Sequence, residues 1–154
     1  MHPGSKDAFK RWPKENFIEL GKLIKKNLNC EILITGIKSE RELMETIAQN
    51  IPGAHVDEPN GSLREFGALL NQMDLLISND TGPVHLACAL NRPVIAIYAS
   101  TDPNVCGPHH AKNASVVSRR ASCNPCLKRK CRLPFCFMQI SPEEVYQSVK
   151  SWIS

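Results

Sequence analysis

The chain has 154 residues, of which 42% belong to the apolar set, and a formal net charge of +4. A chain of this length can bury one sizeable hydrophobic core but not two, so we expect one domain over residues 1–154. No apolar run approaches the roughly 20 residues that cross a bilayer, and residues 1–5 lack the pattern of a signal peptide. These features argue against a membrane-spanning or exported protein, and we expect a soluble, cytoplasmic one.

The first third of the chain alternates helical and strand patterns. Pro13 suits the first turn of a helix, and the residues that follow it at helical spacing are apolar: Phe17, Leu20, Ile24 and Leu28. Residues 31–36 are the next apolar run and predict a buried strand. Ser39 and Glu42 have the spacing of a capping box, which predicts a helix that continues through Ile51.

The same alternation continues to about residue 98. Ser62 and Glu65 form a second capping-box pattern ahead of another helix. Residues 74–78 and 93–98 read as short buried strands, and the residues between them have helical spacing, so this unit is predicted to be βαβ. Ser141 is predicted to cap a last helix over about 142–153.

Alternating strands and helices favour an α/β fold, a Rossmann-like doubly wound parallel sheet. Such sheets bind ligands beyond the carboxyl ends of their strands. Residues 4–5, 36–40 and 80–85 are expected to meet there. Residues 2–5 look like a loop whose preceding strand is absent, so we expect the chain to be cut just inside a domain.

One of these loops has the features of an anion site. Asp80, Thr81, Gly82 and Pro83 open a helix at the end of a predicted strand, where backbone N–H groups are left unpaired and can hold a phosphate. Gly82 permits close approach to the backbone, and His85 lies one turn further on. The alternative is an ordinary helix N-cap without a ligand.

Two further segments carry charges toward the same predicted edge. Lys10 or Arg11 would neutralise a diphosphate, although two adjacent positive charges also suit a solvated corner. Glu40 would accept hydrogen bonds from ribose hydroxyls, or simply complement the positive end of a helix.

Residues 99–140 differ from the rest of the chain and are predicted to be rich in loops. No acidic residue occurs between Asp102 and Glu143, whereas basic residues recur: Lys112, Arg119, Arg120, Lys128, Arg129, Lys130 and Arg132. This segment should prefer an anionic partner.

Four cysteines are crowded in the same segment: Cys123, Cys126, Cys131 and Cys136. Four thiolates can close a zinc site, but the irregular later spacing favours packed thiols or conditional disulfides, and we expect no metal. A zinc or nucleic-acid-binding module over residues 112–136 is the alternative function. Only Phe135 and Phe137 are available there for base stacking, so we expect no nucleic-acid partner.

Taken together, these motifs resemble glycosyltransferase family 9, the ADP-heptose:lipopolysaccharide heptosyltransferases and their relatives, and specifically their carboxyl-terminal, donor-binding half. The matching motifs cover nearly the whole chain: residues 2–5, 10–13, 34–36 with Glu40, 80–87, 91–93, 101–103, 107–108, the Cys-Pro-Cys region over 123–126, and 140–143. The resemblance implies a GT-B architecture of two Rossmann-like domains, of which the amino-terminal domain is absent here.

The resemblance also implies roles for the site residues. Ser5 and Lys10 would contact the donor phosphates, and Glu40 would bind the ribose. The donor would be an ADP-sugar, with a heptose as the expected sugar, and the acceptor a lipid-linked saccharide of the lipopolysaccharide core. Peripheral contact with the inner membrane surface is an open alternative to a purely cytoplasmic location.

The helix start has a matching role in the family. Thr81, Gly82 and Pro83 would offer their backbone to the diphosphate, while Asp80 and His85 would orient the sugar or its phosphate. The inverting reaction would need no metal, and its general base would come from the amino-terminal domain, so the isolated chain would bind without turnover. A nucleotide-sugar epimerase of GT-B form is the second enzymatic alternative.

Overall fold

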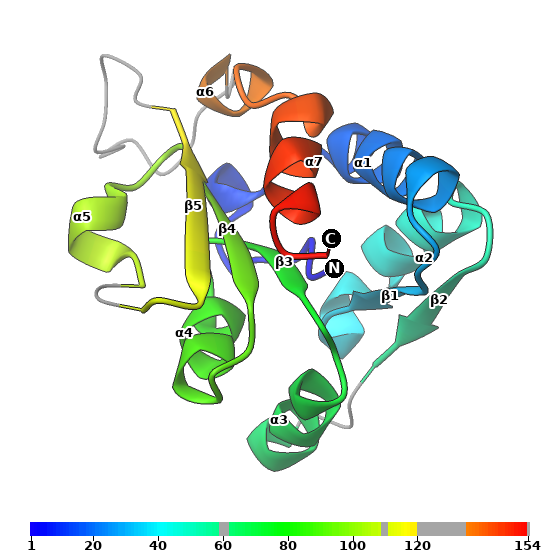
Figure 1. Ribbon diagram of the computed structural model, residues 1–154, viewed down its shortest axis with the longest axis horizontal. Coiled ribbons are helices and arrows are strands. Elements are labelled where there is room, and N and C mark those ends of the chain that lie inside the picture. Colours follow the sequence, from blue (N-terminus) through cyan, green and yellow to red (C-terminus); the bar gives the residue numbers. More distant parts are fainter. Residues whose placement is uncertain (59–61, 109–110, 120–134, 154) are drawn as a thin grey trace.

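The computed structural model describes residues 1–58, 62–108, 111–119 and 135–153 (Figure 1). Its helices are α1 (Lys14–Asn27), α2 (Arg41–Gln49), α3 (Leu63–Asn71), α4 (Gly82–Ala89), α5 (Pro103–Cys106), α6 (Phe135–Met138) and α7 (Pro142–Lys150), with 3₁₀ turns η1 (Ala8–Lys10) and η2 (Lys38–Glu40). Its strands are β1 (Ile32–Thr35), β2 (Ala54–Asp57), β3 (Leu76–Asn79), β4 (Val94–Tyr98) and β5 (Ala114–Ser118). Within these described ranges, no helix has the length and apolar character that a membrane span requires.

The strands pair in parallel, and the first two residues of the chain join them into one layer. β1 pairs with β2, and β4 lies between β3 and β5. Residues 1–2 lie between β1 and β3: the Thr35 N–H donates to the Met1 carbonyl (2.9 Å), and the His2 N–H donates to the Ile77 carbonyl (2.8 Å). The resulting order is β2-β1-(1–2)-β3-β4-β5, as in a Rossmann-like sheet.

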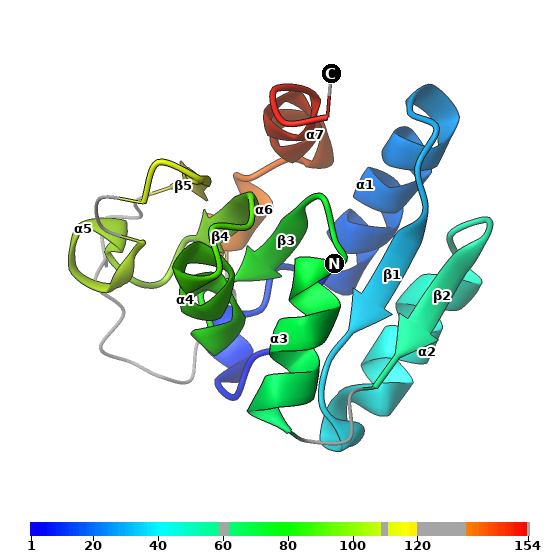
Figure 2. The same ribbon diagram turned by 60° about the horizontal axis from the view of Figure 1, so that its bottom comes forward.

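Helices cover both faces of this sheet. Side chains alternate along a strand, so Ile77 and Ile95 face one core cluster while Leu76 and Val94 face the other. The first cluster includes residues of α1, α2 and α7, and the second includes residues of α3 and α4. Figure 2 shows α3 and α4 on one side of the sheet and α1 and α7 on the other. The predicted doubly wound parallel sheet is therefore confirmed.

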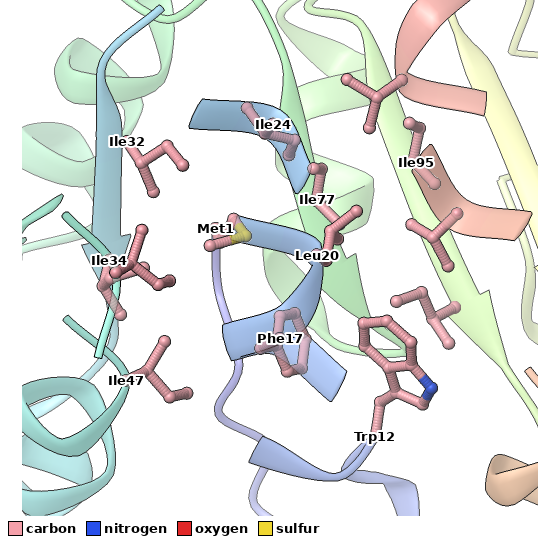
Figure 3. Close-up of a cluster of buried hydrophobic side chains, with 14 of the residues drawn as sticks. Met1, Trp12, Phe17, Leu20, Ile24, Ile32, Ile34, Ile47, Ile77 and Ile95 are labelled. Atoms are coloured by element: carbon pink, nitrogen blue, oxygen red, sulfur yellow. The ribbon is translucent and has the colours of Figure 1, made fainter. Parts of the chain in front are cut away.

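The larger cluster explains the apolar stripe of the first helix. Phe17, Leu20 and Ile24 of α1 are buried against the isoleucines of β1, β3 and β4 (Figure 3). The lysines of this helix remain at its solvent side, as the amphipathic pattern predicts.

Two capping predictions are confirmed and one is wrong. The Ser62 and Ser141 side chains accept hydrogen bonds from backbone N–H groups in the first turns of α3 and α7. Ser39, in contrast, lies inside η2, and α2 begins two residues later at Arg41. The Glu40 carboxylate instead accepts from the Ile37 N–H (3.3 Å), which tightens the chain into a 3₁₀ turn before the α-helix.

Two strands were not predicted. β2 is largely exposed, and β5 contains two serines and one well-buried residue, so neither has the continuous apolar run that identifies a buried strand. β5 lies with α5 and α6 inside residues 99–140, the segment expected to be rich in loops. α7 ends at Lys150, and Trp152 and Ile153 pack on the core beyond the helix.

Candidate functional site

Loops from four neighbouring positions meet at the carboxyl edge of the sheet. They follow residue 2, β1, β3 and β4, and they border two adjoining clefts of about 630 Å³ and about 310 Å³. The clefts share four lining residues, Lys10, Asp80, Thr81 and Gly82. The structure thus brings together segments that the sequence placed at one edge.

The remaining predicted site residues divide between the two clefts. Ser5, Glu40 and Pro83 line the smaller cleft, and the exposed His85 lines the larger one. Every residue predicted for the donor site therefore lines one cleft or both.

The amino terminus of α4 is directed at the shared part of the clefts. Thr81 occupies the N-cap position, but its hydroxyl does not cap the helix; it donates to the Asn79 carbonyl (3.2 Å) and lies 3.1 Å from the Ser78 hydroxyl. A Cβ built at Gly82 would meet no atom within 4 Å. The helix start is consequently open to a ligand, and its dipole favours an anion.

Lys10 stands beside this helix start in an ion pair. Its ammonium donates to Asp80 Oδ2 at 2.7 Å, and the Thr101 hydroxyl donates to the same oxygen at 2.7 Å. The Asp80 side chain is 8% exposed and that of Lys10 is 21% exposed. An ammonium has three N–H donors, so Lys10 retains donors for an anion in the cleft.

Arg11 uses its guanidinium for contacts within the protein. Its Nε and Nη2 donate to the Ser5 carbonyl at 2.9 and 2.6 Å, and Nη2 lies 3.4 Å from Glu40 Oε1. The guanidinium therefore holds the loop after residue 2 against the buried carboxylate of Glu40. Of the two cations that the sequence offered for the diphosphate, the structure leaves Lys10 available.

Asn79, a residue that the sequence analysis missed, links residues 10–12 to the loop after residue 2. Its Oδ1 accepts from the Trp12 N–H (3.0 Å) and its Nδ2 donates to the Pro3 carbonyl (2.8 Å). The side chain is fully buried. A polar residue at the last position of a buried strand is the signal that could have identified it, because a buried amide needs partners from elsewhere.

Tyr98 holds one wall of the larger cleft. Its hydroxyl donates to the Cys106 carbonyl at the end of α5 (3.2 Å). Burial, with the Asp80 carboxylate as a second cause, raises the pKa of Tyr98. The phenol therefore stays protonated and keeps this hydrogen bond.

Substitution of Gly4 by alanine will destabilise the fold by about 2 kcal/mol, a typical cost of overpacking. A Cβ at this position would collide with the Glu40 carboxylate, which Arg11 and the Ile37 N–H hold in place. Urea denaturation measures the loss. Gly82→Ala is the matched control and should leave stability unchanged; equal losses in the two variants would contradict the packing argument.

The stability of the protein will fall as pH is lowered from about 6.5 toward 4 because of His2. The ring is buried, with Nδ1 3.2 Å from the Thr35 hydroxyl, and burial lowers its pKa from 6.5 to about 4. The unfolded chain takes up the proton first, so the stabilisation is complete above pH 6.5 and at most about 3 kcal/mol is lost by pH 4. Chemical denaturation at pH 7.5 and 4.5 checks this, and the loss should shrink in His2→Asn.

The cysteine and basic segments are described only in part. Cys123, Cys126, Cys131, Arg120 and residues 128–132 lie outside the described residues. Cys136 is partly buried and packs against the hydrophobic core, and no group of three or more metal-binding side chains gathers among the residues that the structure describes. Arg119, assigned by the sequence to the basic segment, is paired with Glu144 at 2.8 Å.

The comparison with known families identifies the family of this chain. A family model described as glycosyltransferase family 9 (heptosyltransferase) matches residues 1–136. The chain belongs to glycosyltransferase family 9. This membership confirms the resemblance on which the assignment of site residues was based.

Individual members of family 9 match over almost the whole chain. The lipooligosaccharide heptosyltransferase 2 of Campylobacter jejuni is 27% identical over 97% of this chain and 49% of its own length. The structure of E. coli heptosyltransferase WaaC with ADP has a TM-score of 0.78 at 27% identity, over 97% of this chain and 42% of that one. The E. coli ADP-heptose lps heptosyltransferase II has the same fold, with a TM-score of 0.79 at 21% identity, over 99% of this chain and 45% of that one.

The chain spans about half the length of the curated relatives it matches first. It corresponds to the carboxyl-terminal portion of the solved family 9 structures, which confirms the expected GT-B half.

Proposed function

We propose that this chain is the donor-binding half of a heptosyltransferase that transfers a heptose from ADP-heptose to a saccharide of the lipopolysaccharide core type. The uncapped start of α4 beside the Lys10–Asp80 pair, shared by two clefts, is the observation that carries the proposal. It provides a helix dipole and one cation for a diphosphate, and a cleft extends on each side of this position. The names of the relatives and the ADP bound to the E. coli enzyme support the same ligand.

We propose that the donor lies across both clefts. The diphosphate occupies the shared part, over the backbone of Thr81, Gly82 and Pro83. The nucleoside extends into the smaller cleft, where the Glu40 carboxylate accepts from the ribose hydroxyls and Ser5 contacts a phosphate. This orientation uses the carboxylate that Arg11 already holds in place.

The sugar then occupies the larger cleft, beside His85 and Asp80. As the glycosidic bond breaks, negative charge develops on the departing diphosphate, and the helix start and the Lys10 ammonium stabilise it. These two features perform the role that a divalent cation would otherwise fill, so we propose transfer without a metal. Deprotonation of the acceptor hydroxyl needs a base, which we assign to the amino-terminal half of the enzyme.

The proposed partners follow from this reaction. They are the nucleotide-sugar donor, a lipid-linked saccharide acceptor and the amino-terminal half that would supply the base. Because the proposed acceptor is lipid-linked, we propose that the reaction takes place at the cytoplasmic surface of the inner membrane. The alternative function rests on residues 112–136, and no contact in the described part of that segment favours it.

Calorimetric titration with ADP tests the proposed donor site. Binding is expected in the micromolar to millimolar range, with weaker binding of AMP because it lacks the second phosphate. A folded sample that shows no ADP binding at millimolar concentration would overturn the proposal. Addition of the amino-terminal half should restore sugar transfer; transfer by the 154 residues alone would contradict our assignment of the base, and release of free sugar derivatives would favour the epimerase.

Gly82→Ala will lower the affinity for ADP about tenfold while stability stays unchanged. The new methyl group would stand in the open space at the start of α4 that the diphosphate is proposed to fill. Titration with ADP, in parallel with urea denaturation, separates the two effects. Unchanged ADP affinity would argue against placing the diphosphate on this backbone.

A further inference from the structure

Thr101 touches the donor site through Asp80 and has no role in the site described so far. We infer that Thr101 is a positioning residue, which through Asp80 holds the Lys10 ammonium at the start of α4 in the geometry that an anion requires. This inference rests on the proposed binding of a diphosphate at that place. It adds a residue to the site and assigns Asp80 a specific task.

The contact itself is a shared acceptor. Asp80 Oδ2 accepts from the Thr101 hydroxyl and from the Lys10 ammonium, both at 2.7 Å. The Asp80 side chain is almost fully buried, whereas about a fifth of the Lys10 side chain is exposed. Hydrogen bonds to a charged group at this distance are among the stronger ones in proteins, so the two donors together determine where the carboxylate points.

The Thr101 side chain is stiffer than the Lys10 side chain, and this difference indicates which of the two orients the Asp80 carboxylate. Thr101 is β-branched, and it lies between the carboxyl end of β4 and the N-cap of α5, where Asp102 accepts from the Asn104 N–H (2.9 Å). Lys10 has four flexible methylene groups and ends a turn of three residues. The rigid partner therefore orients the carboxylate, and the carboxylate orients the flexible cation.

Loss of the Thr101 hydroxyl leaves one donor on Asp80 Oδ2. The carboxylate, which still lies beside the Tyr98 hydroxyl, then loses one of its restraints, and the ammonium follows its shift away from the position that suits the diphosphate. Because Lys10 keeps its charge, the expected loss of ADP affinity is about tenfold, smaller than the loss on removing the lysine.

The first experiment titrates ADP into the full chain and its variants. Thr101→Val, which keeps the shape of the side chain, should bind about tenfold more weakly, and Thr101→Ser should restore affinity to within about twofold. Ser100→Ala is the matched control, because the buried Ser100 hydroxyl has no hydrogen-bond partner among the described residues. An equal loss in Ser100→Ala and Thr101→Val, or no rescue by serine, would overturn the inference.

A double-mutant cycle shows whether Thr101 acts through the lysine. In a Lys10→Ala background, Thr101→Val should cost less than about twofold in ADP affinity, because the cation that it orients is gone. A full tenfold loss in that background would mean that Thr101 contacts the ligand directly, and would overturn the inference.

The second measurement needs no ligand, so it remains informative if the proposed function fails. The rate of reductive methylation of Lys10, followed by peptide mass spectrometry, reports how firmly Asp80 holds the ammonium. We expect a rate several-fold higher in Thr101→Val than in the unmodified sequence and no change in Ser100→Ala. Equal Lys10 rates in all variants would overturn the inference, whereas absent ADP binding with a changed Lys10 rate would overturn only the proposed function.

Discussion

Replacing Lys10 with alanine will weaken ADP binding by about a hundredfold. The substitution removes a charge-assisted hydrogen bond to the diphosphate, worth about 2 kcal/mol, and it exposes the ligand to the carboxylate of Asp80, which the lysine now neutralises. Repulsion between that carboxylate and the phosphates adds to the loss. Calorimetric titration of ADP at constant ionic strength measures it.

Two controls separate this local effect from a general change of charge. Lys22→Ala removes an equal charge from an exposed pair with Glu19 and should leave affinity within about twofold. Lys10→Ala combined with Asp80→Asn should bind more tightly than Lys10→Ala alone, since the uncompensated carboxylate is gone. If Lys22→Ala weakens binding as much as Lys10→Ala, the attraction is long-range and no specific contact at Lys10 is needed.

Replacing Trp12 with alanine will lower the free energy of unfolding by about 4 kcal/mol, as expected for a large buried aromatic residue. The side chain is 1% exposed and packs edge-on against Phe17, with 5.0 Å between the ring centroids. Its Nε1 donates to the Ile140 carbonyl (3.0 Å). The substitution leaves a cavity and an unpaired carbonyl in the core. Urea denaturation followed by circular dichroism measures the change.

Trp152 is the matched control for this prediction, since the chain contains two tryptophans. Trp152 is only partly buried at the edge of the core, and its Nε1 donates to the Ser115 hydroxyl (2.9 Å). Trp152→Ala should cost about 1–2 kcal/mol, in proportion to the smaller apolar surface that it removes from water. A cost equal to that of Trp12→Ala would contradict the argument that the deeper burial of Trp12 sets its larger contribution.

Trp12 also links stability to the site. It directly follows Lys10 and Arg11, and its backbone N–H is bound by Asn79 at the end of β3. A variant that loosens this tryptophan displaces the charged segment from the clefts. We therefore expect Trp12→Ala to bind ADP poorly even under conditions where it remains folded.

The parts of the fold that could be predicted were those with a local signal. The buried strands β1, β3 and β4 each contain a run of consecutive apolar residues, and α1 has an apolar stripe, so these patterns identified them. Ser62 and Ser141 were recognised as caps because the capping partner is three residues away. Ser39 has the same spacing, but the prediction that it caps a helix was wrong. The buried Glu40 carboxylate accepts from the Ile37 N–H, and Ser39 lies inside the resulting 3₁₀ turn.

The residues of the proposed donor site were predicted as a set, but the contacts among them were not. The charge pattern offered Lys10 or Arg11, the family resemblance selected Lys10, and neither gave a partner for Asp80 or Glu40. The structure pairs Lys10 with Asp80 and Arg11 with Glu40. Thr101 entered the prediction only as part of a family motif, and its hydrogen bond to Asp80 was not foreseen.

By itself, the sequence determined the helices α1, α3 and α4, the strands β1, β3 and β4, the parallel α/β class and the family, because each depends on patterns within a few neighbouring residues. Only the tertiary structure decided that residues 1–2 lie between β1 and β3, and that Lys10 meets Asp80 across 70 positions of the chain. The physical reason is that hydrophobic periodicity specifies which face of an element is buried, whereas contacts between distant polar groups arise only when the packed sheet brings its carboxyl ends together.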